Sequence, residues 1–490
     1  MIAAYCTNVH PGASLDESLA TLRRDAGAVR ALLVAAGDLE RSAPLGIGWW
    51  LPAAAAASLV ERREGEALPR VRSGAIAELR AALAAEGLRI ATFNAFPHGD
   101  FHGAVVKRAV YSPDWSEPER LKYTLDVAAI AAELAPEGAS MGISTLPLAW
   151  HGSHHPALRR PASAAAASES DALPRRRSES ARDAPERGRR RPVPSAPAGG
   201  ASGSIGVAAE PEEAGLRDQV VRQSAAALAA LTESLAALRM RSGVRVHVDL
   251  EPEPGCLLQR SADVATFVAQ HLRPAARARG VDETTLADHV GICHDTCHAA
   301  VMGESQSAAL ATYAATGLRL GKVQLSSALR VDFDALPFAE RPAARAALGR
   351  FAEARYLHQT ILRRRLATAQ HGRDERDEEL RFYEDLPDAI AALSDPVGEC
   401  RVHFHVPIHL DRVDAALPAL RTTREELIEC LDALPAGSTT LEVETYAWGV
   451  LPGGMRPASL AEGIATELRW LRGELSRRGW DAPSAAVDAP

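Results

Sequence analysis

An acidic and an imidazole side chain stand close together in the run Gly-Ile-Cys-His-Asp-Thr-Cys-His, residues 291–298. The apolar start of this run predicts a buried strand. Asp295 and His298 follow it one helical turn apart, so both side chains point toward the same volume. An acid and an imidazole in this arrangement can hold a metal ion. Taken alone, the pair also fits a helix N-cap beside a surface histidine, because Asp is a common capping residue.

Three other strand-like runs end in an oxygen ligand. Glu251 follows Val-His-Val-Asp-Leu, Gln324 stands in Lys-Val-Gln-Leu-Ser-Ser, and Glu444 ends Leu-Glu-Val-Glu. In Glu-Pro-Glu-Pro-Gly the proline lacks an N–H and ends the strand, which puts Glu251 at a rim and makes Glu253 the competing ligand. Together with Asp295, four oxygen-rich ligands from four strands suit a hard divalent cation.

A second group of histidines follows in His-Phe-His-Val-Pro-Ile-His. His403 and His405 lie on one face of a predicted strand, because strand side chains repeat every second residue, and His409 is nearby. The sequence leaves two interpretations open. The pair supplies auxiliary metal ligands, or it consists of hydrogen-bonded histidines of the core.

The ends of the first predicted strands carry further polar and aromatic side chains. We expect His10, Asn94 and His98 to contact a substrate at the same rim. Trp49 and its neighbour Trp50 either form a wall of that pocket or belong to the core.

Nine candidate strands alternate with stretches of helical period. The strands are 2–7, 45–50, 89–96, 141–146, 244–250, 290–293, 322–325, 402–406 and 441–444, and the helical stretches include 76–86, 121–134, 219–238 and 460–478. Most of the strands are short continuous apolar runs, as expected when helices cover both faces of a sheet. The alternation predicts an α/β fold with a parallel sheet.

Reactive side chains follow strand after strand at the carboxyl end, which is where a (β/α)8 TIM barrel builds its active site. A dinucleotide-binding domain has little support, because no Gly-x-Gly-x-x-Gly opens a helix after the first strand. A barrel uses eight strands. Either one of the nine is a satellite, for which we expect a place within 328–436, or one of them is not a strand.

Residues 158–213 are rich in Arg, Ala, Ser and Pro and hold almost no large apolar side chains. Such a segment cannot bury enough surface to offset the entropy of ordering. We therefore expect a disordered insertion between a first part of the barrel, 1–157, and the remainder, 214–490, which carries the metal-site strands.

The charge of the chain is uneven. Ten arginines against five acids between positions 159 and 191 give +5, so the rest carries −13 of a net charge of −8. An acidic body is repelled by a phosphate backbone, which disfavours tight nucleic-acid binding. We expect a cytoplasmic protein with reduced cysteines, because the six cysteines are scattered and form no Cys-x-x-Cys pair. We expect no membrane insertion, since no signal peptide and no apolar run of about 18 residues occurs.

At these residues the chain resembles the xylose isomerase-like TIM-barrel superfamily, and more closely the EboE-type metabolite traffic proteins within it. The resemblance runs nearly end to end and departs plainly only at the arginine-rich insertion. Its motifs are Tyr-Cys-Thr-Asn-Val-His-Pro-Gly (5–12), Gly-Ile-Gly-Trp-Trp-Leu-Pro (46–52), Thr-Phe-Asn-Ala-Phe-Pro-His-Gly (92–99), Ile-Ser-Thr-Leu-Pro-Leu (143–148), Asp-Leu-Glu-Pro-Glu-Pro-Gly (249–255), His-Asp-Thr-Cys-His (294–298), His-Phe-His-Val-Pro (403–407) and Glu-Val-Glu-Thr (442–445).

The superfamily resemblance implies a metal site built from a glutamate, an aspartate, a histidine or glutamine, and a second glutamate. The matching positions are Glu251, Asp295, Gln324 and Glu444. Many members carry His at the position of Gln324, and an amide oxygen is a weaker donor for later transition metals, so Mg or Mn is favoured over Zn. His403 and His405 are further candidate ligands, because endonuclease-type relatives use extra histidines in a multi-metal cluster.

The resemblance and the residues together imply a metal-dependent isomerase or epimerase that acts on a small hydroxy-carbonyl metabolite. We expect the cation to polarise the carbonyl while Glu251 and Glu444 exchange the base and acid roles. His298 is expected to steer a substrate hydroxyl.

Two other functions stay open at this point. The EboE resemblance implies a role in moving a metabolite precursor out of the cytoplasm, with proteins of the same export gene set as partners, and a non-catalytic carrier with the same pocket would serve that role. An apurinic endonuclease is the third reading, and the acidic body argues against it.

Overall fold

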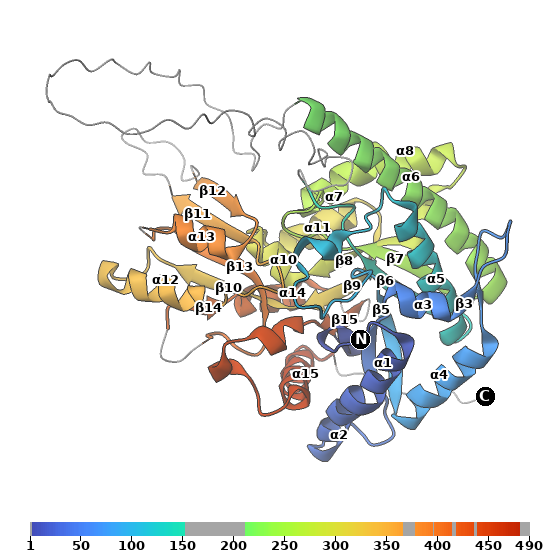
Figure 1. Ribbon diagram of the computed structural model, residues 1–490, viewed down its shortest axis with the longest axis horizontal. Helices are drawn as coiled ribbons and strands as arrows, with labels where there is room; N and C mark the ends of the chain where they lie inside the picture. The colour runs from blue at the N-terminus through green and yellow to red at the C-terminus, as the bar shows by residue number, and fades with distance from the viewer. Residues whose placement is uncertain are drawn as a thin grey trace, which may run out of the picture.

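A computed structural model describes residues 2–151, 211–365, 378–394, 396–413, 418–435 and 439–480. Eight parallel strands close into a barrel in the order β1-β15-β9-β8-β7-β6-β5-β2. Their bounds are β1 Ile2–Cys6, β2 Leu45–Trp50, β5 Leu88–Asn94, β6 Ser140–Thr145, β7 Arg245–Leu250, β8 Val290–Asp295, β9 Arg319–Leu325 and β15 Thr440–Val443. The predicted (β/α)8 barrel is confirmed (Figure 1).

Helices surround the barrel and cover the apolar outward face of each strand. In β7, for example, Val246, Val248 and Leu250 are fully buried against them. The helices are α1 Leu15–Thr21, α2 Gly27–Ala35, α3 Ala53–Ser58, α4 Ser73–Ala85, α5 Pro118–Leu134, α6 Pro211–Ser242, α7 Ser261–Phe267, α8 Arg273–Ala278, α9 Glu283–His289, α10 Thr296–Val301, α11 Gln306–Ala315, α14 Arg424–Ala433 and α15 Leu460–Arg477.

The last helix illustrates how local sequence sets these elements. Ser459 and Glu462 form a capping box, in which each side chain accepts from the other's backbone N–H at 3.2 Å, and this satisfies donors that the first helical turn leaves free. Ile464, Leu468 and Leu471 recur at helical spacing and are buried. The apolar stripe holds α15 against the barrel.

A second sheet is built from five antiparallel strands in the order β12-β11-β13-β10-β14. Its strands are β10 Ser327–Asp332, β11 Thr360–Arg365, β12 Glu378–Tyr383, β13 Glu399–Val406 and β14 Arg421–Thr422, with helices α12 Arg341–Gly349 and α13 Leu386–Ala392 beside them. Figure 1 shows this sheet in orange beside the barrel. The ninth predicted strand, 402–406, is β13, so the expected satellite within 328–436 is confirmed.

The barrel interior is polar beneath its carboxyl end. Lys322 donates to Ser144 Oγ at 2.9 Å and pairs with Glu442 at 3.2 Å, and all three side chains are fully buried. Glycines make room for the acids of this layer. A Cβ at Gly48 would overlap the Glu442 carboxylate, and one at Gly321 would overlap that of Asp249.

Two strand ends differ from the predicted ones. β5 stops at Asn94, whose side chain accepts from the N–H of Phe96 at 2.9 Å and turns the chain. β8 runs two residues beyond the predicted end, because its backbone stays paired with β9, with His294 opposite Val323 and Asp295 opposite Gln324. Residues 158–210 of the predicted insertion lie outside the described residues, and α6 begins at Pro211.

All six cysteines are buried, and none is in a disulfide. In the part of the chain that the structure describes, every helix is too short or too polar to cross a bilayer.

Candidate metal centre

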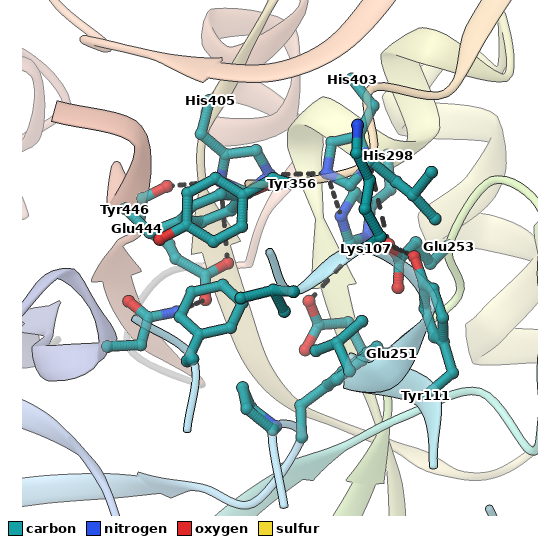
Figure 2. A pocket seen from close by; sticks show the side chains of 17 residues that line it. Lys107, Tyr111, Glu251, Glu253, His298, Tyr356, His403, His405, Glu444 and Tyr446 are labelled. Carbon is teal, nitrogen blue, oxygen red and sulfur yellow. Dashed lines mark hydrogen bonds and ion pairs between the residues drawn. The ribbon is translucent and has the colours of Figure 1, made fainter. Parts of the chain in front are cut away.

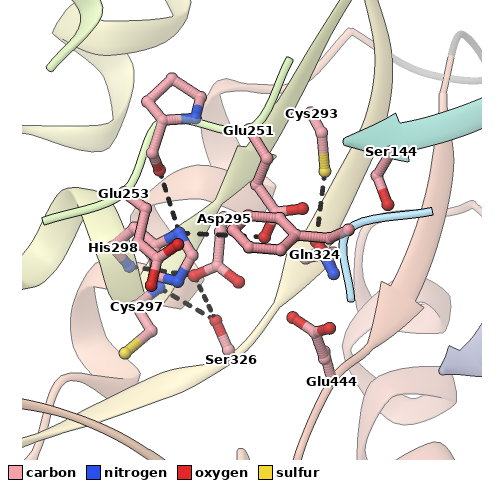
Figure 3. A network of polar contacts seen from close by, with 12 residues as sticks. Ser144, Glu251, Glu253, Cys293, Asp295, Cys297, His298, Gln324, Ser326 and Glu444 are labelled. Atoms are coloured by element: carbon pink, nitrogen blue, oxygen red, sulfur yellow. Dashed lines mark hydrogen bonds and ion pairs between the residues drawn. The ribbon is translucent and has the colours of Figure 1, made fainter. Parts of the chain in front are cut away.

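Three carboxylates meet at the carboxyl end of the barrel. Glu251 follows β7, Asp295 ends β8 and Glu444 follows β15. One oxygen from each lies within 4.8 Å of the others, and all three side chains are buried (Figure 3). The strand ends that the sequence singled out therefore lie at one point, since the barrel brings the carboxyl ends of its strands to the same mouth.

Burial and mutual repulsion set the charges of this cluster. Burial, together with the neighbouring carboxylates, raises the pKa of Glu251 and of Glu444 well above the usual glutamate range. Burial also opposes ionisation of Asp295, but His298, His405 and a hydrogen bond from Ser326 outweigh it and lower the pKa of this carboxyl. The charged forms of Glu251 and Glu444 are therefore disfavoured in this cluster, whereas the charged form of Asp295 is favoured by its neighbours.

Two oxygens of the cluster lack a partner among the described residues. They are Glu251 Oε2 and Asp295 Oδ2, and both are buried. Buried polar atoms are almost always hydrogen-bonded, so an unpaired carboxylate oxygen needs an explanation. A divalent cation provides one, because carboxylate oxygens are the ligands that Mg²⁺ and Mn²⁺ prefer. The three carboxylates fit such an ion.

Gln324 lies beside the cluster but does not aim its oxygen there. Its Oε1 accepts from Cys293 Sγ at 3.2 Å. The amide is close enough to Glu444 to lower the pKa of that carboxyl, as a donor does. To bind a cation through oxygen, the amide must turn by about half a turn, an exchange of nearly isosteric atoms. Gln324 as a metal ligand stays a prediction.

Glu444 is held in place by two amides. Asn8 Nδ2 donates to Glu444 Oε1 at 2.7 Å, and Asn94 Nδ2 approaches the same oxygen at 3.4 Å. Lys322 lies beneath and lowers the pKa of both Glu251 and Glu444. The sequence analysis assigned no role to Asn8 or Lys322. The position of Lys322 in a predicted buried strand could have indicated a buried, paired lysine.

Three histidines stand beside the carboxylates. His403 and His405 come from β13, and His298 comes from α10. His403 Nε2 lies 3.1 Å from the Nε2 atoms of both His298 and His405. Burial lowers the pKa of His403 well below its usual range and that of His405 to about 4, so both imidazoles are neutral near pH 7.

Glu251, Glu253, Glu444 and the three histidines line one side of a small cavity of about 60 Å³. The remaining walls are mainly aromatic and aliphatic (Figure 2). They include Phe96, Phe101, Tyr111, Tyr356, Leu357 and Tyr446.

One wall of the cavity joins the barrel to the second sheet. The N–H groups of Val106 and Lys107, which follow β5, donate to the carbonyl of Arg355 at 2.7 and 2.9 Å. The Lys107 ammonium pairs with Asp385 at the start of α13. A ligand in the cavity would therefore contact both parts of the fold.

The expected substrate contacts do not line this cavity. His10 is buried next to Tyr5 at 3.2 Å, His98 packs on Tyr123 with ring centroids 5.0 Å apart, and Trp49 packs on Phe93 in the core. Asn94 is the nearest of them to the cavity, because its Nδ2 lies 3.4 Å from Oε1 of Glu444, which lines it. Their contact with a substrate stays a prediction.

Two further residues that the sequence weighed have distinct places. His409 lines a separate pocket beside Trp448. Glu253 lies in the main cavity and accepts from Tyr111 at 2.7 Å and from Gln359 Nε2 at 3.3 Å. Glu253 Oε1 thus accepts two hydrogen bonds from neutral donors, whereas Glu251 Oε2 has no hydrogen-bond partner among the described residues. This difference favours Glu251 over Glu253 in the carboxylate cluster.

No family model matches the chain, and no curated protein matches it. Solved structures that resemble it include a xylose isomerase-like TIM barrel protein from Mycobacterium smegmatis in complex with magnesium, at 10% identity over 97% of each chain with a TM-score of 0.40. The IolI protein with a bound zinc atom matches at 11% identity over 97% of this chain and 99% of that chain, with a TM-score of 0.38. An L-ribulose 3-epimerase matches at 11% identity over 100% and 99%, with a TM-score of 0.35. The barrel assignment rests on the strand order of the chain itself.

Proposed function

We propose that the protein is a divalent-metal-dependent isomerase or epimerase that moves a proton next to the carbonyl of a small hydroxy-carbonyl compound. The observation that carries the proposal is the meeting of Glu251, Asp295 and Glu444, with one oxygen of each within 4.8 Å of the others. Glu251 and Glu444 also line the cavity. Two of these acids have a raised pKa, and a carboxyl group with a raised pKa holds a proton more readily and can take it from a substrate and return it.

Glu251, Asp295 and Glu444 would hold the cation, and Gln324 would join them after its amide turns. When bound, the cation supplies a Lewis acid that polarises the carbonyl oxygen and favours loss of a proton from the adjacent carbon. The protein's own contribution is then a base and an acid on different sides of the site.

Glu251 is the better base of the two glutamates. Its Oε2 has no partner among the described residues, so this carboxylate can serve a cation through one oxygen and a substrate proton through the other. Glu444 Oε1 already accepts from Asn8 at 2.7 Å, which leaves it the role of orienting acid. The unequal surroundings give the two carboxyls unequal proton affinities, as acid-base catalysis at one site requires.

The walls of the cavity indicate the kind of substrate. Phe101, Tyr356 and Tyr446 lie against one another, with ring centroids 5.0 to 5.3 Å apart. Aromatic rings of this kind stack on the C–H face of a compact ligand, while the acids and imidazoles opposite bind its hydroxyl and carbonyl groups. A small hydroxy-carbonyl compound with one apolar face suits both surfaces.

The proposal is tested by solvent exchange. Purified protein with Mg²⁺ or Mn²⁺ is incubated in D₂O with a panel of aldoses, ketoses and other hydroxy-carbonyl compounds, and proton NMR follows the proton next to the carbonyl. We expect that signal to decay for at least one compound. Glu251→Gln should slow the decay by about 100-fold or more, because a general base is lost.

The matched control is Glu304→Gln, which alters a carboxylate bonded to Ser261 outside the cavity. It should leave exchange unchanged. Binding of a panel compound without exchange in the metal-loaded protein would refute the isomerase and favour the carrier. The role in metabolite traffic, with other proteins of an export gene set, stays a prediction in either case.

A further inference from the structure

A second pocket lies beside α15, apart from the carboxylate cluster. Its volume is about 270 Å³, against about 60 Å³ for the cavity at the cluster, and the two have no lining residue in common. An apolar cavity of about 150 Å³ is large enough to bind one benzene molecule. The second pocket therefore has room for an aromatic ring with a substituent.

Three segments that are distant in the sequence form the second pocket. The first follows β13, the second follows β15, and the third is the first part of α15, with Gly463 and Thr466. Most of the lining is apolar, and a flat tryptophan ring, proline rings and a thioether favour an aromatic ligand over a flexible chain. The apolar side chains are Pro407, Leu410, Val413, Trp448, Met455 and Pro457.

The walls of this pocket are held in place without a ligand. Trp448 Nε1 donates to Glu467 Oε2 at 3.2 Å, and the N–H of Ile408, next to Pro407, donates to Glu467 Oε1 at 3.0 Å. Gly463 lets two walls approach α15 closely, because a Cβ there would lie 2.9 Å from the Trp448 ring and 3.0 Å from Pro457. A ligand thus meets a surface that is already formed, which reduces the cost of ordering on binding.

One polar atom at this pocket lacks a partner. Nδ1 of His409 is buried and makes no hydrogen bond to any described residue. Burial, together with the nearby Arg424, lowers the pKa of His409, so its imidazole is neutral near pH 7. Thr466 also lines the pocket, but its hydroxyl already donates to the carbonyl of Glu462 at 2.8 Å. His409 is therefore the polar anchor that the pocket offers to a ligand.

Water is a poor partner for this imidazole nitrogen. A buried water molecule usually makes about three hydrogen bonds, and the apolar walls offer it little besides His409 and Thr466. An apolar ring that displaces such loosely held water gains affinity. A hydroxyl group on that ring satisfies Nδ1 in either tautomer of the imidazole, because a hydroxyl both donates and accepts.

We infer that the second pocket binds a small aromatic alcohol, whose ring lies against Trp448 and the two prolines and whose hydroxyl bonds His409 Nδ1. The volume sets the size of the ligand, the walls set its ring, and the unpartnered nitrogen sets its hydroxyl. The inference does not rest on the proposed function, since the lining residues of the two pockets are all different.

The test compares 4-fluorophenol with fluorobenzene, which lacks the hydroxyl, as probes of the full chain. The protein has five methionines, and ¹³C-labelling of their methyl groups gives a signal at the pocket from Met455, assigned through Met455→Leu. We expect 4-fluorophenol to shift this signal with a Kd of about 1 mM or lower. The signal of Met240, which is 88% exposed on α6, should stay in place. Fluorobenzene should bind about 5-fold more weakly, as expected for one lost hydrogen bond.

His409→Phe keeps a ring at the wall and removes the nitrogen. This variant should bind the two probes with affinities within about 2-fold of each other. The matched control is His271→Phe, because His271 is a half-buried histidine that packs on Phe267, with ring centroids 6.2 Å apart, and does not line the pocket. It should keep the preference of the wild type. A Met455 signal that neither probe moves, equal affinities of the wild type for both probes, or a preference for 4-fluorophenol that persists in His409→Phe would each overturn the inference.

Discussion

Glu467 provides a stability prediction with a defined dependence on pH. This residue of α15 is only 1% exposed and holds the segment after Glu444. It accepts from Thr445 Oγ1 at 2.6 Å, from the Ile408 N–H at 3.0 Å and from Trp448 Nε1 at 3.2 Å. Burial raises the pKa of Glu467 from 4.5 to about 7, although these hydrogen bonds lower it in part.

The direction in which stability changes with pH follows from proton linkage. Because the folded pKa is the higher one, the folded state binds more protons than the unfolded state between pH 4.5 and about 7. Stability is therefore lost as the pH rises through this window. Each unit of difference is worth about 1.4 kcal/mol, so the carboxylate costs the folded state about 3 kcal/mol above the window.

Glu467→Gln removes the ionisable carboxyl and with it the loss of folding stability at higher pH. The new amide nitrogen faces the Trp448 N–H, which costs stability at every pH and cancels in a comparison across pH. We expect urea unfolding, followed by tryptophan fluorescence, to show the variant gaining about 3 kcal/mol on the wild type between about pH 5 and pH 8. Glu78→Gln, exposed on α4, is the matched control. A stability difference that stays constant between the two pH values would refute the reasoning.

Three shorter predictions concern the barrel interior and the carboxylate cluster. Glu442→Gln leaves the buried Lys322 ammonium without its partner and should lower the free energy of unfolding by about 3–5 kcal/mol in denaturant titrations, with partial recovery when Lys322→Met is added. Gly321→Ala places a methyl group on the Asp249 carboxylate and should lower the melting temperature, with a cost of about 1–3 kcal/mol. Mn²⁺ at about 100 times its Kd should stabilise the wild type by about 2.7 kcal/mol in the same titrations, and Glu251→Gln should lose this gain.

The barrel was predictable because its strands are short apolar runs with turn or helix signals on either side. All nine predicted strands exist, and the one outside the barrel lies in the expected region. The other four strands of the second sheet were not identified. β11 and β12 have the sequences Thr-Ile-Leu-Arg-Arg-Arg and Glu-Glu-Leu-Arg-Phe-Tyr. These charged strands pair in an antiparallel register that sets Arg364 opposite Glu379, and no apolar period marks such a pairing.

The site was predictable only as far as strand ends define it. Glu251, Asp295 and Glu444 follow strands whose carboxyl ends meet in a barrel, so their meeting follows from topology. The direction of the Gln324 amide and the pairing of Lys322 with Glu442 depend on packing inside the barrel. His98, a polar residue near the first strands, packs on the Tyr123 ring instead of lining the cavity. A sequence pattern does not show which way such a side chain points.

The charges of the centre connect its two kinds of donor. Glu251, Asp295 and Glu444 bring three carboxylates into one buried volume, and the Lys322 ammonium beneath them is already paired with Glu442. One divalent cation among the three carboxylates leaves an excess negative charge, which falls on the oxygen least engaged by the protein. Asp295 Oδ2 is such an oxygen, and it lies on the side of His405. His298 and His405 stand beside Asp295 and lower the pKa of its carboxyl, so the carboxylates and the neighbouring imidazoles interact through this one residue.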